Sequence, residues 1–359
     1  MLPRNNTSGW ASSDRFELSA TALSLSAVCG VCDDPTGARG LRSMAAGCKT
    51  SGPCRILLVA IFLSCLVMGC STAQRTSADD TAPETPLFSF VHLTDIHCSV
   101  APRPAVAPPA VAFLDIAGYK AYWTDRAGAA ARLEHTVEYL NAAIRPDFVL
   151  VTGDLTSGGS LDDLRRVKEI LGRLDMPYHT LMGDNDAPRR GADSNGEAYV
   201  RLFGTPDTFF DRGGWRVILL SGDPGEANLA WLEEVIESAD GRPVILCTHL
   251  LVFADPLTAV LANFYGERAT MTRGAKVEEI LARHPNVALV LSGHVHCNLQ
   301  WRRGGTTFYT TAALAGVPAA FRLFRVFRDR VEMHLYEADG IEKMASGEWR
   351  VTAVVTERR

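Results

Sequence analysis

The sequence predicts an α/β fold, and three features of its 359 residues support this class. Short continuous apolar runs recur between residues 88 and 291, as in parallel sheets that are covered on both faces. Amphipathic segments with helical spacing separate several of these runs. Beyond residue 298 the pattern changes to short alternating strands that are bounded by glycine and aspartate turns. With 47% hydrophobic and 21% charged residues, the composition is ordinary for a globular enzyme.

Residues 1–43 have no hydrophobic periodicity, and we interpret them as an unstructured leader or as upstream sequence that is not translated. Residues 44–70 resemble a bacterial lipoprotein signal peptide. Lys49 and Arg55 form a positively charged start, and the apolar core that follows is too short to span a bilayer comfortably. The core ends in a Val-Met-Gly-Cys run, and the resemblance implies that Cys70 is lipidated. An uncleaved anchor helix is the alternative. Either interpretation exports the protein and attaches it to a membrane.

Residues 71–85 are polar and contain proline, so we expect a flexible tether between the anchor and one folded domain over residues 86–359. Ser71 directly after the lipidated cysteine would by resemblance favour the outer membrane. The expected location is therefore the bacterial cell envelope, on its periplasmic or outer surface. A formal net charge of −5 and the lack of a basic run argue against a nucleic-acid partner.

Five predicted strands, at 88–93, 148–152, 178–182, 243–248 and 286–291, each run into aspartate, histidine or asparagine. Open α/β sheets bind their ligands outside the carboxyl ends of the strands, so we expect one shared site there. If the extended backbone continues past residue 293, the last two histidines point the same way, as imidazoles of one metal site must. The candidate residues are Asp95, His97, Asp154, Asp184, Asn185, His249, His294 and His296.

The number of candidate ligands indicates the chemistry. One zinc ion needs three or four protein ligands, whereas this set offers seven carboxylates and imidazoles, which suit two divalent cations such as Mn, Fe or Zn. One carboxylate must bridge the pair, and Asp154 is the natural candidate. Such a pair deprotonates a bridging water near neutral pH, and it stabilises two oxygens of an in-line displacement at phosphorus.

The order of these motifs resembles the calcineurin-like metallophosphoesterases over residues 88–337, and most closely their bacterial cyclic-nucleotide-phosphodiesterase-like branch. The resemblance implies a four-layer α/β/β/α sandwich with two mixed sheets. It also implies a dinuclear centre whose bridging hydroxide hydrolyses a small-molecule phosphate diester or monoester. The implied ligands are Asp95, His97, Asp154 and His296 for the first metal, and Asp154, Asp184, His249 and His294 for the second.

The third motif departs from the family pattern, in which Gly-Asn-His is followed by Asp or Glu. Here Asp184 replaces the amide ligand, and its negative charge should tighten metal binding and reduce the Lewis acidity of the centre. Asn185 stands where the family's catalytic histidine helps protonate the leaving oxygen, and an amide cannot donate a proton from a cationic state. General acid catalysis contributes about 10²–10⁴-fold. We therefore expect a slow enzyme, a substrate with a good leaving group, or a proton donor from elsewhere.

A non-catalytic or weakly active descendant that binds a ligand or partner is the alternative, and Asn185 motivates it. Retention of all seven ligand positions favours the enzyme, because a pure binding module has no need to hold two cations. Three other segments lie near the expected site. An insertion with Tyr119, Lys120, Tyr122 and Trp123 either contacts the substrate or only attaches its loop to the sheet, and the pair Arg189 and Arg190 either binds a substrate phosphate or is solvated. Residues 253–265 form a further insertion near His249, which we interpret as a lid.

Three cysteines of the expected domain, Cys98, Cys247 and Cys297, lie within two residues of a proposed ligand. An odd set predicts no disulfide framework. A metal or redox role competes with simple packing behind the site. The remaining predicted elements are helices at 126–144, 161–174, 228–238 and 272–282, a strand at 215–220, strands at 299–301, 306–310, 321–327 and 330–336 that close the second sheet, and a last strand at 349–355.

Overall fold

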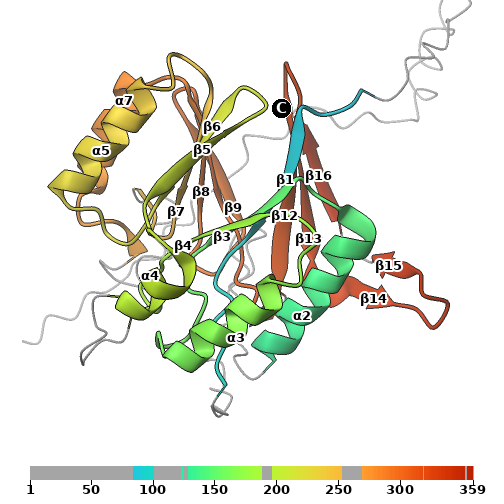
Figure 1. The fold of residues 1–359 in the computed structure, drawn as a ribbon. Coiled ribbons are helices and arrows are strands. Elements are labelled where there is room, and N and C mark those ends of the chain that lie inside the picture. The colour runs from blue at the N-terminus through green and yellow to red at the C-terminus, as the bar shows by residue number, and fades with distance from the viewer. Residues whose placement is uncertain are drawn as a thin grey trace, which may run out of the picture. The chain divides into compact units, whose positions relative to one another are not determined.

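Two six-stranded mixed sheets lie at the centre of the fold, with helices outside them (Figure 1). The computed structural model describes residues 84–100, 123–124, 128–187, 196–252, 269–317, 319–351 and 354–358. Internal contacts group Thr81–Arg359 into one unit. Within the described ranges, no helix combines the length and apolar character that a membrane crossing requires.

The first sheet has a parallel half and an antiparallel half. Its spatial order is β16 (Val354–Arg358), β13 (Val331–Glu337), β12 (Ala320–Val326), β1 (Phe88–Leu93), β3 (Phe148–Thr152) and β4 (Tyr178–Leu181). Strands β1, β3 and β4 are parallel to one another, and β12 pairs antiparallel with β1 on its other side.

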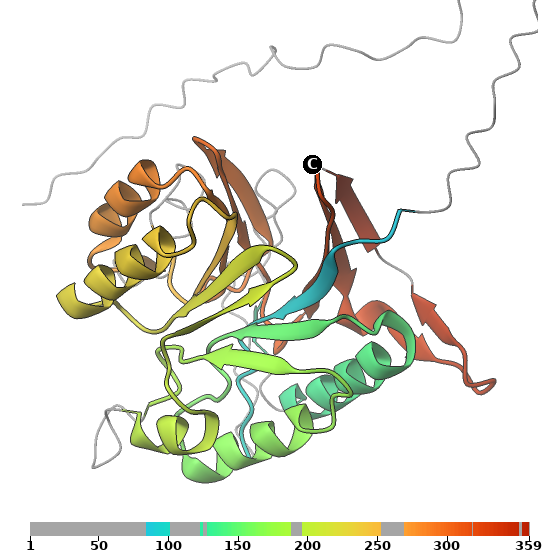
Figure 2. The ribbon, with the colours of Figure 1, turned by 45° about the horizontal axis from the view of Figure 1, so that its top comes forward.

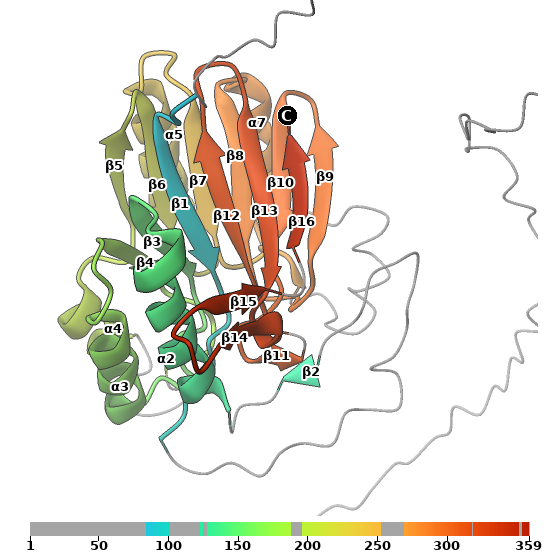
Figure 3. The same cartoon turned by 90° about the vertical axis from the view of Figure 1, so that its right-hand side faces the viewer.

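The second sheet has four parallel strands at its centre and one antiparallel strand at each edge. Its order is β5 (Thr208–Arg212), β6 (Trp215–Leu220), β7 (Val244–Thr248), β8 (Val287–Ser292), β10 (Thr306–Thr310) and β9 (Leu299–Arg303). Figure 3 shows this sheet behind the strands of the first.

Apolar residues on both faces of the strands explain the four layers. In β3, Val149 and Val151 belong to the core under the helices of the first sheet, whereas Phe148 and Leu150 belong to the core between the sheets. In β6, Ile218 and Leu220 belong to the core under the helices of the second sheet. The predicted α/β/β/α sandwich is therefore confirmed (Figure 2).

The helices follow the predicted amphipathic segments. On the first sheet lie α2 (Ala129–Tyr139), which continues as a π-helical turn, η1 (Leu140–Ile144), and α3 (Leu161–Leu171); on the second lie α5 (Glu226–Glu237) and α7 (Gly274–Arg283). Helix α3 begins where the Ser160 hydroxyl accepts a hydrogen bond from the Asp163 N–H, and two aspartates in its first turn complement the helix dipole.

The prediction that the four strands between residues 299 and 336 close the second sheet is wrong for two of them. Strands β9 and β10 do join the second sheet, but β12 and β13 join the first. The reason is that β1 would otherwise form an edge: β12 pairs with it from Phe88 to His92 and stacks Phe324 on Phe90, with ring centroids 4.8 Å apart.

Several short elements were not predicted, and the expected last strand is in fact two. Residues 349–355 contain β15 (Trp349–Val351) and the start of β16, which belong to different sheets. The unpredicted elements are α4 (Glu197–Phe203), β5, the pair β2 (Trp123–Thr124) and β11 (Gly316–Val317), η3 (Ala338–Gly340), and β14 (Ile341–Lys343), which pairs with β15.

Candidate metal centre

The carboxyl ends of five parallel strands meet at one place and bring all seven predicted ligands into two groups. Strands β1, β3 and β4 come from the first sheet, and β7 and β8 come from the second. In each group the candidate ligand atoms lie within 4.8 Å of one another. Asp154 belongs to both groups, as expected for a bridging carboxylate.

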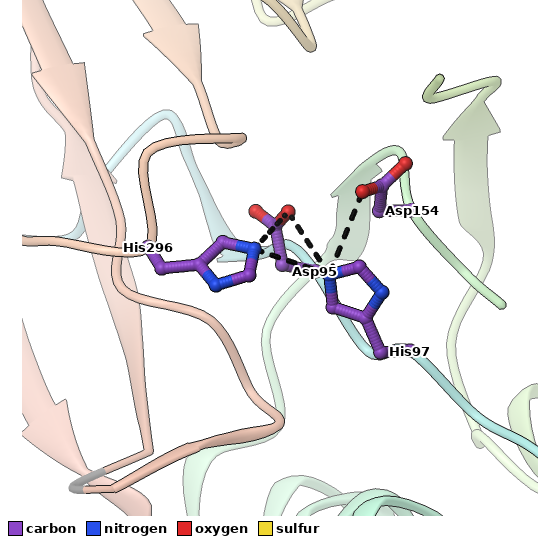
Figure 4. Close-up of side chains that lie close together, drawn as sticks. All are labelled: Asp95, His97, Asp154 and His296. Atoms are coloured by element: carbon purple, nitrogen blue, oxygen red, sulfur yellow. Dashed lines mark hydrogen bonds and ion pairs between the residues drawn. The ribbon is translucent and has the colours of Figure 1, made fainter. Parts of the chain in front are cut away.

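The first group contains Asp95, His97, Asp154 and His296 (Figure 4). The Nε2 atoms of His97 and His296 are 3.1 Å apart. His296 Nε2 also lies 3.1 Å from Asp95 Oδ1, and His97 Nε2 lies 3.5 Å from Asp154 Oδ2. Two imidazole nitrogens and two carboxylate oxygens thus converge on one point.

The second group contains Asp154, Asp184, His249 and His294. His249 Nε2 lies 3.4 Å from Asp154 Oδ1 and 3.1 Å from Asp184 Oδ1. His294 Nδ1 lies 3.1 Å from the same Asp184 oxygen. The Asp184 side chain is 42% exposed, whereas that of His249 is buried, so this group has one open side.

The backbone at most of these residues is left-handed. Asp95, His97, Asp154, His294 and His296 have φ between 49° and 66°, and they are five of the seven non-glycine residues with positive φ among those described. Each such residue costs about 1–3 kcal/mol and persists only where the surroundings fix it, typically at functional sites. The expected extended continuation past Gly293 is therefore wrong: β8 ends at Ser292, and the two histidines that follow enter different groups.

Buried hydrogen bonds aim the first carboxylate. Asp95 Oδ2 accepts from the Thr94 hydroxyl at 2.7 Å and from the His294 N–H at 2.9 Å. Its other oxygen, Oδ1, is buried and has no hydrogen-bond donor among the described residues. That oxygen faces the two imidazoles of the first group, which leaves it available to a cation.

A buried polar network supports the second group and was not recognised from the sequence. The Thr152 carbonyl accepts a hydrogen bond from His249 Nδ1 at 2.8 Å, which turns Nε2 of that ring toward the carboxylates. The Thr152 hydroxyl pairs with His92 Nε2, and the Thr311 hydroxyl with His92 Nδ1, both at 2.8 Å. The sequence identifies His92 only as part of a strand, because the partners of its ring come from segments distant in sequence.

Two glycines permit the close approach of these loops. A Cβ atom at Gly293 would overlap the Thr94 hydroxyl, and one at Gly183 would overlap the backbone and carboxylate of Asp154. Any larger residue at either position would displace a candidate ligand.

The loop that carries Asp184 is fixed by its neighbours. Asp186 accepts hydrogen bonds from Gly183 N–H at Oδ2 and from Thr156 N–H at Oδ1, both at 2.9 Å. Burial, and then the charge of Asp154, raise the pKa of Asp186 to about 7. Asn185 donates its backbone N–H to Asp154 Oδ1 at 2.8 Å and its side-chain Nδ2–H to Asp154 Oδ2 at 2.7 Å.

The charges of the ligand atoms support one another. Burial alone would raise the pKa of Asp95, but His296 and the other imidazoles hold that pKa well below its usual value. For Asp184, too, desolvation is outweighed by hydrogen bonds to His249 and His294, and its pKa is lowered. All three carboxylates therefore remain ionised at neutral pH, which is the state that binds a cation.

These residues fit divalent metal ions. Imidazole nitrogens face each other at 3.1 Å and 3.2 Å, an arrangement in which at most one of each pair can donate a hydrogen bond. A cation bound by the first pair, His97 and His296, would satisfy both nitrogens and the buried Asp95 Oδ1 at once. Mixed carboxylate and imidazole ligands suit Mn, Fe or Zn.

The three described cysteines lie outside both groups, which favours the packing interpretation. Cys98, Cys247 and Cys297 are buried free thiols, and none belongs to a candidate metal group among the described residues. Burial raises the pKa of Cys98 to about 11 and that of Cys297 to about 12.

Several predicted contacts fall outside the described residues. They are Cys70, Tyr119, Lys120, Tyr122, Arg189, Arg190 and the segment 253–265. For Trp123 only the backbone is described, in β2.

The seven candidate ligands thus form two groups that share one carboxylate, at the carboxyl ends of strands from two facing sheets. The family model "Calcineurin-like phosphoesterase" matches residues 88–298, more than half of the chain. The chain belongs to this family, and it is a hydrolase that acts on phosphate ester bonds.

Two relatives agree with this assignment, and one solved structure shares the fold. A protein described as a probable cyclic nucleotide phosphodiesterase, from Synechococcus sp., is 27% identical over 73% of this chain and 98% of its own length. The 3',5'-cyclic adenosine monophosphate phosphodiesterase CpdA of Pseudomonas aeruginosa is 26% identical over 45% of this chain and 58% of its own. A dimetal phosphatase from Danio rerio shares the fold, with a TM-score of 0.54 and 16% identity over 76% of this chain and 99% of its own.

Proposed function

We propose that this protein hydrolyses a small-molecule phosphate diester or monoester at a centre of two divalent metal ions, Mn, Fe or Zn. The observation that carries the proposal is the position of Asp154, which belongs to both ligand groups. A carboxylate shared in this way could hold both cations. The relatives named as cyclic nucleotide phosphodiesterases favour a diester.

When bound, the two cations supply a water of lowered pKa as nucleophile and neutralise the charge that develops on the phosphate oxygens. The protein's residues set the geometry for this chemistry. Asp154 aligns the two groups, and the Thr152 carbonyl keeps the proton of His249 on Nδ1, away from the centre. Asp184, as the exposed ligand, lies on the side from which a substrate can enter.

Asn185 has no dissociable proton, so the proton for the leaving oxygen comes from solvent or from another group. We therefore expect turnover to favour substrates with good leaving groups, since about 10²–10⁴-fold of general acid catalysis is missing at this position. The alternative function, a weakly active or non-catalytic protein that binds a ligand or partner, is favoured by the same residue.

One assay separates the two functions. The protein, reconstituted with Mn²⁺, is given a phosphodiester and a phosphomonoester side by side, with Asp154→Asn as the control. Turnover that disappears in the control supports the enzyme, and the preferred ester identifies its class. With two metals bound and neither ester hydrolysed, the enzymatic proposal fails and the binding function takes its place.

We also propose that residues 44–70 direct export, that Cys70 carries the lipid anchor, and that residues 71–85 connect it to the catalytic domain over residues 86–359, with residues 1–43 as a leader. The support is the sequence pattern alone. Metabolic labelling with a palmitate analogue should modify the wild-type protein and not Cys70→Ser, and a labelled variant would exclude Cys70 as the anchor.

A further inference from the structure

One residue contacts both oxygens of the shared carboxylate. The backbone N–H of Asn185 donates to Asp154 Oδ1 at 2.8 Å, and its carboxamide Nδ2–H donates to Oδ2 at 2.7 Å. The Asp154 side chain is only 2% exposed, so solvent does not compete strongly for these contacts. Both hydrogen bonds go to an ionised group and are of the stronger, charge-assisted kind.

The same two oxygens face different ligand groups. Oδ1 lies 3.4 Å from His249 Nε2 in the second group, and Oδ2 lies 3.5 Å from His97 Nε2 in the first. A carboxylate oxygen has two lone pairs, so each can accept one hydrogen bond from Asn185 and still offer a lone pair to a cation. The χ2 angle of aspartate is otherwise broadly distributed, and rotation about it would change which group each oxygen faces.

Asn185 is itself held firmly enough to fix that angle. Its loop is held by the two hydrogen bonds of Asp186, to Gly183 N–H and Thr156 N–H. The Thr156 hydroxyl adds a longer contact, 3.4 Å, to the Asn185 carbonyl. A side chain mounted on such a loop can orient its neighbour with little loss of entropy on metal binding.

We propose that Asn185 is a positioning residue that sets the orientation of Asp154, so that one carboxylate oxygen serves each ligand group. This inference rests on the proposed two-metal function. It gives the carboxamide a role that needs no proton transfer, because one of its two N–H groups donates to Asp154.

Loss of the Asn185 carboxamide should change how the two bound metal ions interact with each other. The full chain is titrated with Mn²⁺ as wild type, Asn185→Ala and Asn185→Leu, and is followed by calorimetry and by low-temperature electron paramagnetic resonance. Leucine has as many side-chain heavy atoms as asparagine and branches at the same carbon, but it cannot donate a hydrogen bond. Comparison of the two variants therefore separates the loss of the donor from the loss of the space that it fills. Asn141→Ala is the matched control, since Asn141 also donates through Nδ2, to the Arg173 carbonyl at 2.7 Å, on the outer helical layer.

We expect the wild type and the control to bind two Mn²⁺ and give the spectrum of an exchange-coupled pair. In both Asn185 variants the second binding step should weaken by about 10–100-fold, as is typical when an outer partner of a ligand is lost, and the signal of an isolated Mn²⁺ should replace the coupled spectrum at equal loading. Circular dichroism shows whether the variants are folded. Wild-type affinity and an unchanged coupled spectrum in either folded variant would overturn the inference, whereas a wild type that binds no pair would overturn the proposed function instead.

Discussion

The two ligand groups share Asp154 but differ in how the fold holds them. In the first group all four residues have left-handed backbone, and Asp95 and His97 have side chains that are at most 2% exposed. In the second group only Asp154 and His294 are left-handed, and Asp184 is 42% exposed. The first group therefore lies mainly at the buried ends of β1 and β3, whereas the second group includes Asp184 on an exposed loop.

This difference indicates that the two sites have different roles. Burial and fixed geometry reduce the reorganisation that metal binding requires, so we expect the first group to hold its cation more tightly. The open side of the second group leaves room for exchange and for a substrate oxygen. Substitutions that alter one group and leave the other unchanged test this difference.

The largest effect is expected for Asp154→Asn, because this residue belongs to both groups. The amide removes the shared negative charge and offers one oxygen where two were used. Turnover should fall by more than about 100-fold, beyond the 10–100-fold typical of an outer partner, and neither cation should bind as in the wild type. Elemental analysis after gel filtration measures the bound metal, and retention of two equivalents would contradict the shared role.

Asparagine substitutions in the separate groups should give unequal losses. In Asp95→Asn the Oδ2 position still meets two donors, from Thr94 and His294, so the amide oxygen must take it and the NH₂ group replaces the ligand atom. We expect the affinity for the first metal to fall by about 100-fold.

In Asp184→Asn the amide oxygen can keep facing His249 and His294, and only charge is lost. The second metal should then weaken by about 10-fold while the first is unchanged. Calorimetric titration of both variants compares the two steps. Equal losses would mean that the two groups are equivalent.

A smaller effect is expected on the stability of the protein at low pH, through His92 in the buried network behind the second group. Burial, and then the positive charge of Arg322, lower the pKa of His92 to about 3. The folded protein therefore keeps this ring neutral, while the unfolded chain binds a proton below pH 6.5. The stability that the neutral ring contributes is complete above pH 6.5 and is lost as the pH falls toward 3.

Between pH 7 and pH 5 this loss should amount to about 2 kcal/mol in the free energy of unfolding. Urea unfolding of the metal-free protein measures it, and His92→Gln should lack this part of the pH dependence. The same pH slope in both proteins would show that another group is responsible.

The smallest effect on metal binding is expected for Cys297→Ala. This thiol is buried next to His296 in sequence, but it lies outside both groups, and the Thr310 hydroxyl donates to its backbone carbonyl at 2.7 Å. We expect two metal equivalents to be retained and a stability loss of about 1 kcal/mol. A reduced metal content in the folded variant would assign the thiol to the centre.

Much of the fold could be predicted because its central strands are apolar on both faces. Strands β1, β3 and β6 have the predicted bounds, since each fills two cores at once. The sheet to which β12 belongs could not be predicted, because alternation identifies a strand but not its partner. The π-helical end of the helix over residues 126–144 also has no pattern of its own.

For the site, the residue types and their place after strands predicted which side chains converge. The sequence could not indicate the left-handed backbone at Asp95 or His296, because aspartate and histidine tolerate that region without requiring it. Nor could it reveal that the Asn185 carboxamide would contact Asp154, since that contact depends on how two loops from different strands meet.

We expect catalysis to require a metal ion in both groups, and stepwise loading with Mn²⁺ tests this requirement. Metal-free protein is given increasing equivalents of Mn²⁺, and phosphodiester hydrolysis is measured at each step together with the bound metal. We predict little turnover with one equivalent, held by the first group, and full turnover only with two. Full turnover at one equivalent would contradict the two-metal account, and so would the absence of turnover with two equivalents bound.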